Sequence, residues 1–206
     1  MSPGNVIQSE AELEQMFARP ASASILKVTT RLTDTYRRWI EASPFFTIAT
    51  CGPEGLDCSP RGDAAGFVRV ADESTLLLPE RRGNNRLDTL RNVVNDPRVG
   101  LLFLVPGITE TLRVNGRAVL SKDEGLCGSF AVQGKAPRVV IVVTIDAVYF
   151  QCARALVRSR LWDPAGFRDV GELPTAGTML AEASGGNEGG SQYDAELPER
   201  LRTTLY

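Results

Sequence analysis

The middle of the chain consists of short strand-like segments that are separated mostly by turns. These segments are rich in β-branched, aromatic and aliphatic residues, and Gly, Pro, Asn or Asp residues lie between them. Strands joined by tight turns pair antiparallel, because a parallel pair needs a long crossover. The predicted strands are FFTIATC (45–51), a hairpin partner beginning near Asp57, GFVRVA (66–71), STLLLP (74–79), RVGLLFLV (98–105), ETLRVNGRAVLS (110–121) and PRVVIVVTIDAVYF (137–150).

These six or seven strands predict a mainly β (α+β) fold with helices at its periphery. A closed or partly closed barrel is the economical arrangement, since closure removes free strand edges. RVGLLFLV (98–105) is almost entirely apolar, which predicts a strand covered on both faces. Segment 110–121 alternates apolar and polar residues, and Gly116 within it predicts a bend or bulge.

Helical patterns flank and interrupt the strands. Ser9 followed by Glu12 has the spacing of a capping box, which predicts a helix over 9–18. The other predicted helices cover 22–42, 84–95, 122–131 and 152–162, with a flexible connector at 184–191 and one or two helical turns near the end. We therefore expect three parts: N-terminal helices that pack on the barrel (1–43), a barrel domain (44–162) and a C-terminal arm (163–206).

Composition excludes several classes of chemistry. The 206 residues include no histidine, which argues against Ser-His-Asp and Cys-His catalysis and against histidine-ligated haem. The four cysteines are scattered, so no metal site is predicted. A net charge of -2 gives no general attraction for nucleic acid. The sequence shows neither an apolar run of membrane-spanning length nor a signal-peptide pattern, and we expect a cytoplasmic protein that binds no membrane.

The segment ERRGNNRLDTLRN (80–92) concentrates positive charge where a helix is predicted to begin. Asn84 or Asn85 is a suitable N-cap, and Arg82 and Arg86 lie beside it. Positive charge here opposes the helix dipole, whereas a bound phosphate would be stabilised by both arginines and free N–H groups. Arg61, in SPRGD (59–63), is expected to lie beside this corner. The competing interpretation is a solvated cluster paired with nearby carboxylates.

The ordered set of motifs FFTIAT, SPRGD, TLLLPERRGNNRLDTLRNVVNDPRVGLLFLVPG and ETLRVNGRA resembles the pyridoxamine 5'-phosphate oxidase-like, FMN-binding split-barrel family. The resemblance covers about residues 40–160 and is closest to a bacterial oxidase-related branch of unassigned substrate. It implies a six-stranded antiparallel split β-barrel that forms a homodimer, with FMN bound at the subunit interface.

The resemblance also implies roles for individual residues in FMN binding. Arg86 would grip the FMN phosphate with Asn84 and Asn85 beside it, and Arg61 corresponds to the basic group on the preceding strand. The remaining expected contacts are made by backbone at Leu78 and Pro79, by Thr111 and Arg113 near the flavin ring, and by Lys135, Arg158 and Trp162 from the other subunit.

An FMN-dependent oxidoreductase acting on a small molecule or a reduced nicotinamide is the function that the resemblance implies. The lack of histidine argues against pyridoxal formation, because pyridoxamine-oxidising relatives use an arginine–histidine segment on their substrate. No residue in the sequence demands a catalytic role. A non-catalytic flavin carrier or sensor and a deazaflavin-dependent reductase on the same fold therefore stay open as alternatives.

Overall fold

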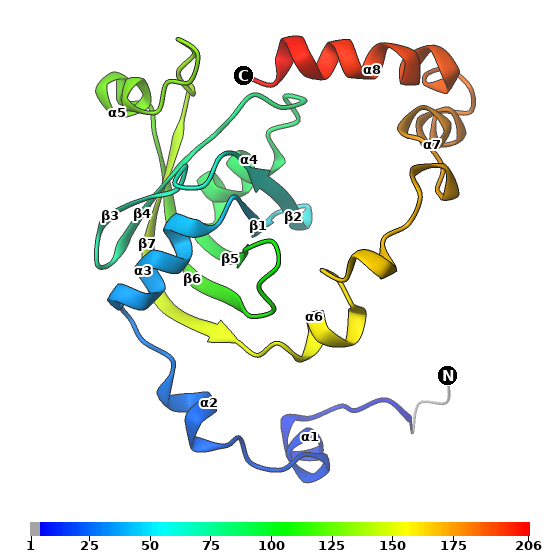
Figure 1. Ribbon diagram of the computed structural model, residues 1–206. Helices are drawn as coiled ribbons and strands as arrows, with labels where there is room; N and C mark the ends of the chain where they lie inside the picture. The colour runs from blue at the N-terminus through cyan, green and yellow to red at the C-terminus, as the bar shows by residue number, and fades with distance from the viewer. Residues whose placement is uncertain (1–4) are drawn as a thin grey trace.

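The computed structural model describes residues 5–206 and contains one antiparallel sheet of seven strands (Figure 1). The strand order is β2-β1-β5-β6-β7-β4-β3. All seven predicted strands are present, within a few residues of the expected boundaries. They are β1 (Phe45–Gly52), β2 (Gly55–Gly62), β3 (Arg69–Asp72), β4 (Thr75–Pro79), β5 (Arg98–Leu104), β6 (Thr111–Ser121) and β7 (Val140–Gln151).

The expectation of a closed six-stranded barrel is wrong in two respects. The sheet has seven strands, and no backbone pairing within residues 5–206 joins β2 to β3, the two edges of the sheet. The seventh strand arises because β3 and β4 form a hairpin of their own on the far side of β7. The sheet is therefore open, and its two edge strands are connected by the short segment 63–68 rather than by a ladder of backbone hydrogen bonds.

The helices differ in how far they contact the sheet. They are α1 (Glu10–Met16), α2 (Ser22–Leu26), α3 (Asp34–Ala42), α4 (Asp88–Asn95), α5 (Glu124–Ser129), α6 (Arg154–Ser159), α7 (Ala176–Ala183) and α8 (Gly190–Thr204). The core lies between α3, α4 and the inner face of the sheet, where Ile40 and Val93 pack with Phe46, Phe103 and Leu112. Helices α1 and α2 contain no buried residue and lie apart from the sheet (Figure 1).

The single helix predicted over 22–42 is interrupted. Thr29 instead pairs with Val148 of β7, with reciprocal N–H···O distances of 3.0 and 2.8 Å between the two backbones. The run Val28-Thr29-Thr30 has β-branched side chains throughout, which lowers helix propensity and favours extended pairing. The capping box is confirmed in part, because the Ser9 hydroxyl accepts a hydrogen bond from the Glu12 N–H.

β5 is covered on one face only within the chain. Val99, Leu101 and Phe103 are buried, whereas Leu102 and Leu104 on the other face are only half-buried. The prediction of a strand covered on both faces is therefore not met by a single chain. Among residues 5–206, no helix has both the length and the apolar character needed to cross a bilayer.

The C-terminal arm is more ordered than its sequence predicts. Residues 176–183 form α7, and α8 extends over 15 residues rather than one or two turns. The Gly-rich stretch between them is a tight turn in which Gly185, Gly186 and Gly189 have positive φ angles. Gly residues adopt this conformation without steric cost, so the composition that suggested a flexible connector builds a helical hairpin.

The bulge predicted at Gly116 is confirmed. The register between β6 and β7 shifts at Asn115/Gly116, and a Cβ atom on Gly116 would lie 2.2 Å from the Thr144 carbonyl oxygen. We expect Gly116→Ala to lower the free energy of unfolding by about 1–3 kcal/mol, because backbone must move to admit the methyl group.

Chemical denaturation of Gly116→Ala should be compared with Gly128→Ala. Gly128 lies in α5, and a methyl group added there would have no atom within 4 Å. The Gly128 variant should be as stable as the unchanged protein or slightly more stable, since Ala favours helix. Equal stability of the two variants would contradict the tight packing at Gly116.

Candidate functional site: a basic cavity at the end of the sheet

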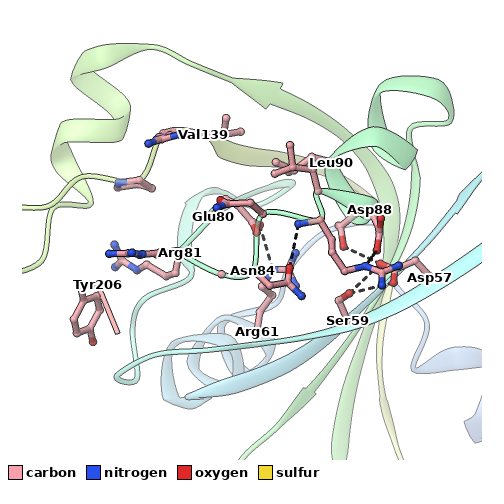
Figure 2. A pocket seen from close by; sticks show the side chains of 18 of the residues that line it. Asp57, Ser59, Arg61, Glu80, Arg81, Asn84, Asp88, Leu90, Val139 and Tyr206 are labelled. Carbon is pink, nitrogen blue, oxygen red and sulfur yellow. Dashed lines mark hydrogen bonds and ion pairs between the residues drawn. The ribbon is translucent and has the colours of Figure 1, made fainter. Parts of the chain in front are cut away.

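A cavity of about 1040 Å³ opens where β2, the segment after β4, the start of α4 and the segment before β7 meet. Most of its wall comes from residues 80–90 and 135–139, with β2 closing one side (Figure 2). Its lining includes the basic residues Arg61, Arg81, Arg82, Arg86, Lys135 and Arg138 and the acidic residues Asp57, Glu80 and Asp88. Positive charge therefore exceeds negative charge in the cavity.

Two ion pairs hold the two ends of the sheet together at this cavity. Arg61 Nε of β2 lies 3.1 Å from Glu80 Oε2, and Arg81 Nε lies 2.7 Å from Asp63 Oδ2. The expectation that Arg61 lies beside the cationic segment is met. β2 is not paired with β4, and the contact between them here is the ion pair of Arg61 with Glu80.

The net effect of the surroundings on the pKa differs between the two carboxylates of these pairs. Burial raises the pKa of Glu80 above its ordinary value, although the Arg61 guanidinium opposes the change. Burial would also raise the pKa of Asp63, but hydrogen bonds from Tyr206, the Ala64 N–H and Arg81 together hold it below its ordinary value. The surroundings of Asp63 therefore stabilise its charge, whereas those of Glu80 oppose it.

The helix predicted at 84–95 begins later than expected, at Asp88. Neither Asn84 nor Asn85 caps it, because the Asn84 Oδ1 atom accepts a hydrogen bond of 3.1 Å from the Arg86 N–H and holds a local turn. Short polar side chains commonly compete with the helix in this way. The residue before the helix is Leu87, whose side chain provides no cap.

Residues 85–87 have an unusual backbone. Asn85 and Leu87 have φ angles of 59° and 63°, in the left-handed region that a bulky residue such as leucine rarely adopts. Such conformations cluster at functional sites. Because no side chain caps α4, the N–H groups of its first turn stay available to an anion in the cavity.

The helix α4 is fixed to the β1–β2 hairpin, which in turn fixes this loop. Thr89 Oγ1 donates to Asp57 Oδ2 at 2.8 Å, and Asn92 Nδ2 donates to Thr50 Oγ1 at 3.1 Å. A Cβ atom on Gly52 would lie only 2.0 Å from Oδ1 of Asn92, so a side chain there would displace the Asn92 side chain from this position. The start of α4 is thus held by side chains rather than by a cap.

The basic residues of the cavity differ in what they already bind. Arg86 pairs with Asp88 at 2.8 Å, but its side chain is 74% exposed, and exposed pairs contribute little to stability. Arg82 and Arg138 have no carboxylate partner among the residues that the structure describes. The donor set is therefore arginine, lysine and free backbone N–H groups, which suits a phosphate group.

The structure brings half of the sequence-predicted residues to this cavity. Arg61, Arg82, Asn84, Asn85, Arg86 and Lys135 all line it. Leu78 and Pro79 are buried in β4, next to the cavity in sequence but not among its lining residues.

The other predicted residues lie elsewhere in the protomer. Thr111 is buried and its hydroxyl lies 3.3 Å from Gln151 Oε1. Arg113 Nη1 donates to the Tyr149 hydroxyl at 3.2 Å on the outer face of the sheet. Arg158 is exposed on α6, and Trp162 Nε1 donates to the Ile108 carbonyl at 2.8 Å.

Sequence reasoning missed Arg138 and Tyr206 as cavity residues. The position of Arg138 could have been inferred, because antiparallel pairing of β4 with β7 places the segment before β7 opposite the segment after β4. Tyr206 carries no comparable signal. It reaches the cavity only because the C-terminal arm returns to it.

Solved structures that resemble the chain have low sequence identity to it. HupZ from group A Streptococcus is 16% identical, with a TM-score of 0.48 and coverage of 57% of this chain and 91% of that one. A candidate pyridoxamine 5'-phosphate oxidase from Lactobacillus delbrueckii is 22% identical (TM-score 0.46; coverage 59% and 95%). An FMN-binding protein from Syntrophomonas wolfei is 12% identical (TM-score 0.45; coverage 56% and 83%).

The comparison with proteins of curated function found no match. The family model described as pyridoxamine 5'-phosphate oxidase matches residues 32–152, which is more than half of the chain. This range contains all seven strands, α4 and the arginine-rich segment. The chain therefore belongs to the pyridoxamine 5'-phosphate oxidase family.

Proposed function

We propose that the protein binds FMN by its phosphate in the basic cavity and acts as an FMN-dependent oxidoreductase. The observation that carries the proposal is the arrangement of Arg82, Arg86 and the uncapped start of α4 around one cavity. A phosphate monoester carries about -1.5 to -2 charges and accepts several hydrogen bonds. Family membership supports the proposal that this phosphate is part of a flavin nucleotide.

The residues present fit this group. Arg82 and Arg86 would hold the phosphate with the first-turn N–H groups of α4, and Asn84 and Asn85 would lie beside it. A Cβ atom added to Gly83 would have no atom within 4 Å, so the loop leaves open space there. Bound FMN supplies two-electron chemistry through its ring system, and the protein supplies position and electrostatics.

We further propose a homodimer in which each subunit contributes to the other's flavin site. The support is an apolar outer face that one chain leaves uncovered, with Phe45 37% exposed and Leu102 and Leu104 half-buried. Arg113 lies in the same cross-strand row as Leu102 and Tyr149, so a subunit covering this face would meet it. The cytoplasmic location stays a prediction from sequence.

The first experiment is the visible absorption spectrum of the purified protein, followed by titration with FMN, riboflavin and a deazaflavin. We expect FMN to bind and riboflavin, which lacks the phosphate, to bind much more weakly. Equal binding of FMN and riboflavin would contradict the phosphate site. Preferential binding of the deazaflavin would show that the cofactor is a deazaflavin and not FMN.

A turnover assay separates an oxidoreductase from a flavin carrier. We expect the FMN-loaded protein to accept electrons from a reduced nicotinamide and to pass them to dioxygen or a quinone. A protein that binds FMN but accepts no reductant would be a carrier or sensor. Pyridoxamine 5'-phosphate should not be oxidised, because the chain has no histidine to bind it as pyridoxamine-oxidising relatives do.

Arg86→Ala should weaken FMN binding about ten- to a hundred-fold, because a charge-assisted contact to the phosphate is lost. Riboflavin binding should not change. Arg160→Ala is the matched control: Arg160 is also an exposed arginine paired with a nearby carboxylate, Asp163 at 2.6 Å, and it does not line the cavity. Isothermal titration at fixed salt provides the affinities. If Arg86→Ala bound FMN with the affinity of the wild-type protein, Arg86 would not be part of the phosphate site.

Glu80→Gln should tighten FMN binding about three- to ten-fold at neutral pH. The substitution removes a partly buried negative charge from the cavity and releases Arg61 from an ion pair, while the amide oxygen still accepts its hydrogen bond. Fluorescence titration with FMN and with riboflavin tests this, since only FMN should gain affinity.

The control for this variant is Glu73→Gln. Glu73 also pairs with an arginine, Arg31, but on the exposed surface away from the cavity. It should bind FMN as the unchanged protein does. Weaker FMN binding by Glu80→Gln would mean that Glu80 supports the ligand rather than opposing it.

A further inference from the structure

The C-terminal arm is a helical hairpin that holds itself together. Asp194 of α8 accepts hydrogen bonds from the Gly177 N–H at 2.7 Å and from Thr175 Oγ1 at 2.5 Å. A Cβ on Gly177 would lie 2.3 Å from the Gly190 carbonyl oxygen, so the two helices are in close contact. α7 and α8 pack mainly on each other.

Tyr206, just after α8, is the point at which the arm meets the basic cavity. Its hydroxyl donates to Asp63 Oδ1 at 2.7 Å, and its main-chain oxygen accepts a hydrogen bond of 2.8 Å from Lys135 Nζ. Its ring lies 5.7 Å from the Arg81 guanidinium. Figure 2 shows Tyr206 beside Arg81 at one end of the cavity, which Tyr206 lines.

The acceptor of the Tyr206 hydroxyl is rigid and buried. The Asp63 side chain is 5% exposed and also accepts from Arg81 Nε and from the Ala64 N–H at 2.8 Å. Arg81 is held from its other side by the Phe130 carbonyl at 2.8 Å. A hydrogen bond to a charged, fixed acceptor is stronger than one to a neutral or mobile group.

The arm therefore reaches the cavity through Tyr206, which forms hydrogen bonds with residues on two sides of it. Asp63 follows β2, whereas Lys135 belongs to the segment before β7, and Tyr206 lies between them. Because α7 and α8 pack mainly on each other, these two hydrogen bonds are important for keeping the last residue of the arm at the cavity. A segment that closes a binding site mainly changes how fast the ligand leaves.

We propose that Tyr206 and Asp63 form a latch that holds the arm across one end of the basic cavity and slows the escape of a bound mononucleotide. The second half of this proposal rests on the proposed FMN binding. Tyr206 acts here as a positioning residue: it holds the end of the arm at the cavity and accepts a hydrogen bond from Lys135, which also lines the cavity.

The latch itself is tested without any ligand. Trypsin can cleave after Arg200 and Arg202 near the end of α8. We expect Tyr206→Phe to be cleaved there several-fold faster than the unchanged protein, because losing the hydroxyl releases the end of the arm. Tyr193→Phe is the matched control: it is the same substitution in α8, at a ring that stacks 4.1 Å from Arg200 and does not line the cavity.

The effect on the ligand is tested by stopped-flow fluorescence with FMN. Tyr206→Phe should release FMN about three- to ten-fold faster with little change in the association rate, and Tyr193→Phe should match the unchanged protein. Asp63→Asn should also accelerate release, and Tyr206→Phe keeps the test valid if loss of the Asp63 charge prevents folding.

The latch should be insensitive to pH near neutrality. Burial acts to raise the pKa of Asp63, but hydrogen bonds from Tyr206, the Ala64 N–H and Arg81 together lower it. The hydrogen bond to Asp63 raises the pKa of Tyr206, so Asp63 stays ionised and Tyr206 stays protonated between about pH 5 and 8. The difference in release rate between the unchanged protein and Tyr206→Phe should be constant over this range. It should diminish as acid protonates Asp63 or as base deprotonates Tyr206.

The outcomes separate this proposal from the proposed function. Unchanged trypsin cleavage in Tyr206→Phe, or release of FMN at or below the wild-type rate, would overturn the latch. If the wild-type protein did not bind FMN, the proposed function would be overturned. The proteolysis experiment alone would then show whether Tyr206 anchors the arm.

Discussion

The two neighbouring ion pairs, Arg61–Glu80 and Arg81–Asp63, are the interactions on which the basic cavity depends. They join the end of β2 to the segment after β4, although these strands lie near opposite ends of the sheet order. All four side chains are mostly shielded from water, so removing one partner would leave a buried charge without compensation. The sheet stays open in its backbone pairing but is drawn together by side chains at the place where the cavity lies.

The strands could be predicted from the sequence because their signals are local. Period-two alternation, β-branched content and turn residues all lie within each segment, and the Gly116 bulge was marked by a glycine inside an alternating run. The failures arose where a distant contact decided the conformation. Thr29 pairs with Val148, which breaks a helix that its own periodicity favours, and Asp194 organises an arm whose Gly-rich turn suggested flexibility.

The residues of the candidate site also fall into those that local sequence signals could predict and those that depend on distant contacts. The arginine-rich segment 80–92 was visible because its charge is concentrated in consecutive residues. The first residue of α4 was not, because Asn84 satisfies a loop N–H instead of capping the helix. Asp63 appeared only as part of SPRGD, and Tyr206 stood in a tail with no pattern. Their hydrogen bond spans 143 positions in the chain, and no local rule predicts a contact of that separation.

The left-handed backbone at Leu87 couples ligand binding in the cavity to the stability of α4. A non-glycine residue in this conformation costs roughly 1–2 kcal/mol, and the absence of a capping side chain costs α4 about 1 kcal/mol more. An anion seated against the first turn would supply the hydrogen-bond acceptors that the protein itself withholds there. The bound ligand would then act as the N-cap of α4, so the stability of the first turn of this helix would depend on whether the cavity is occupied.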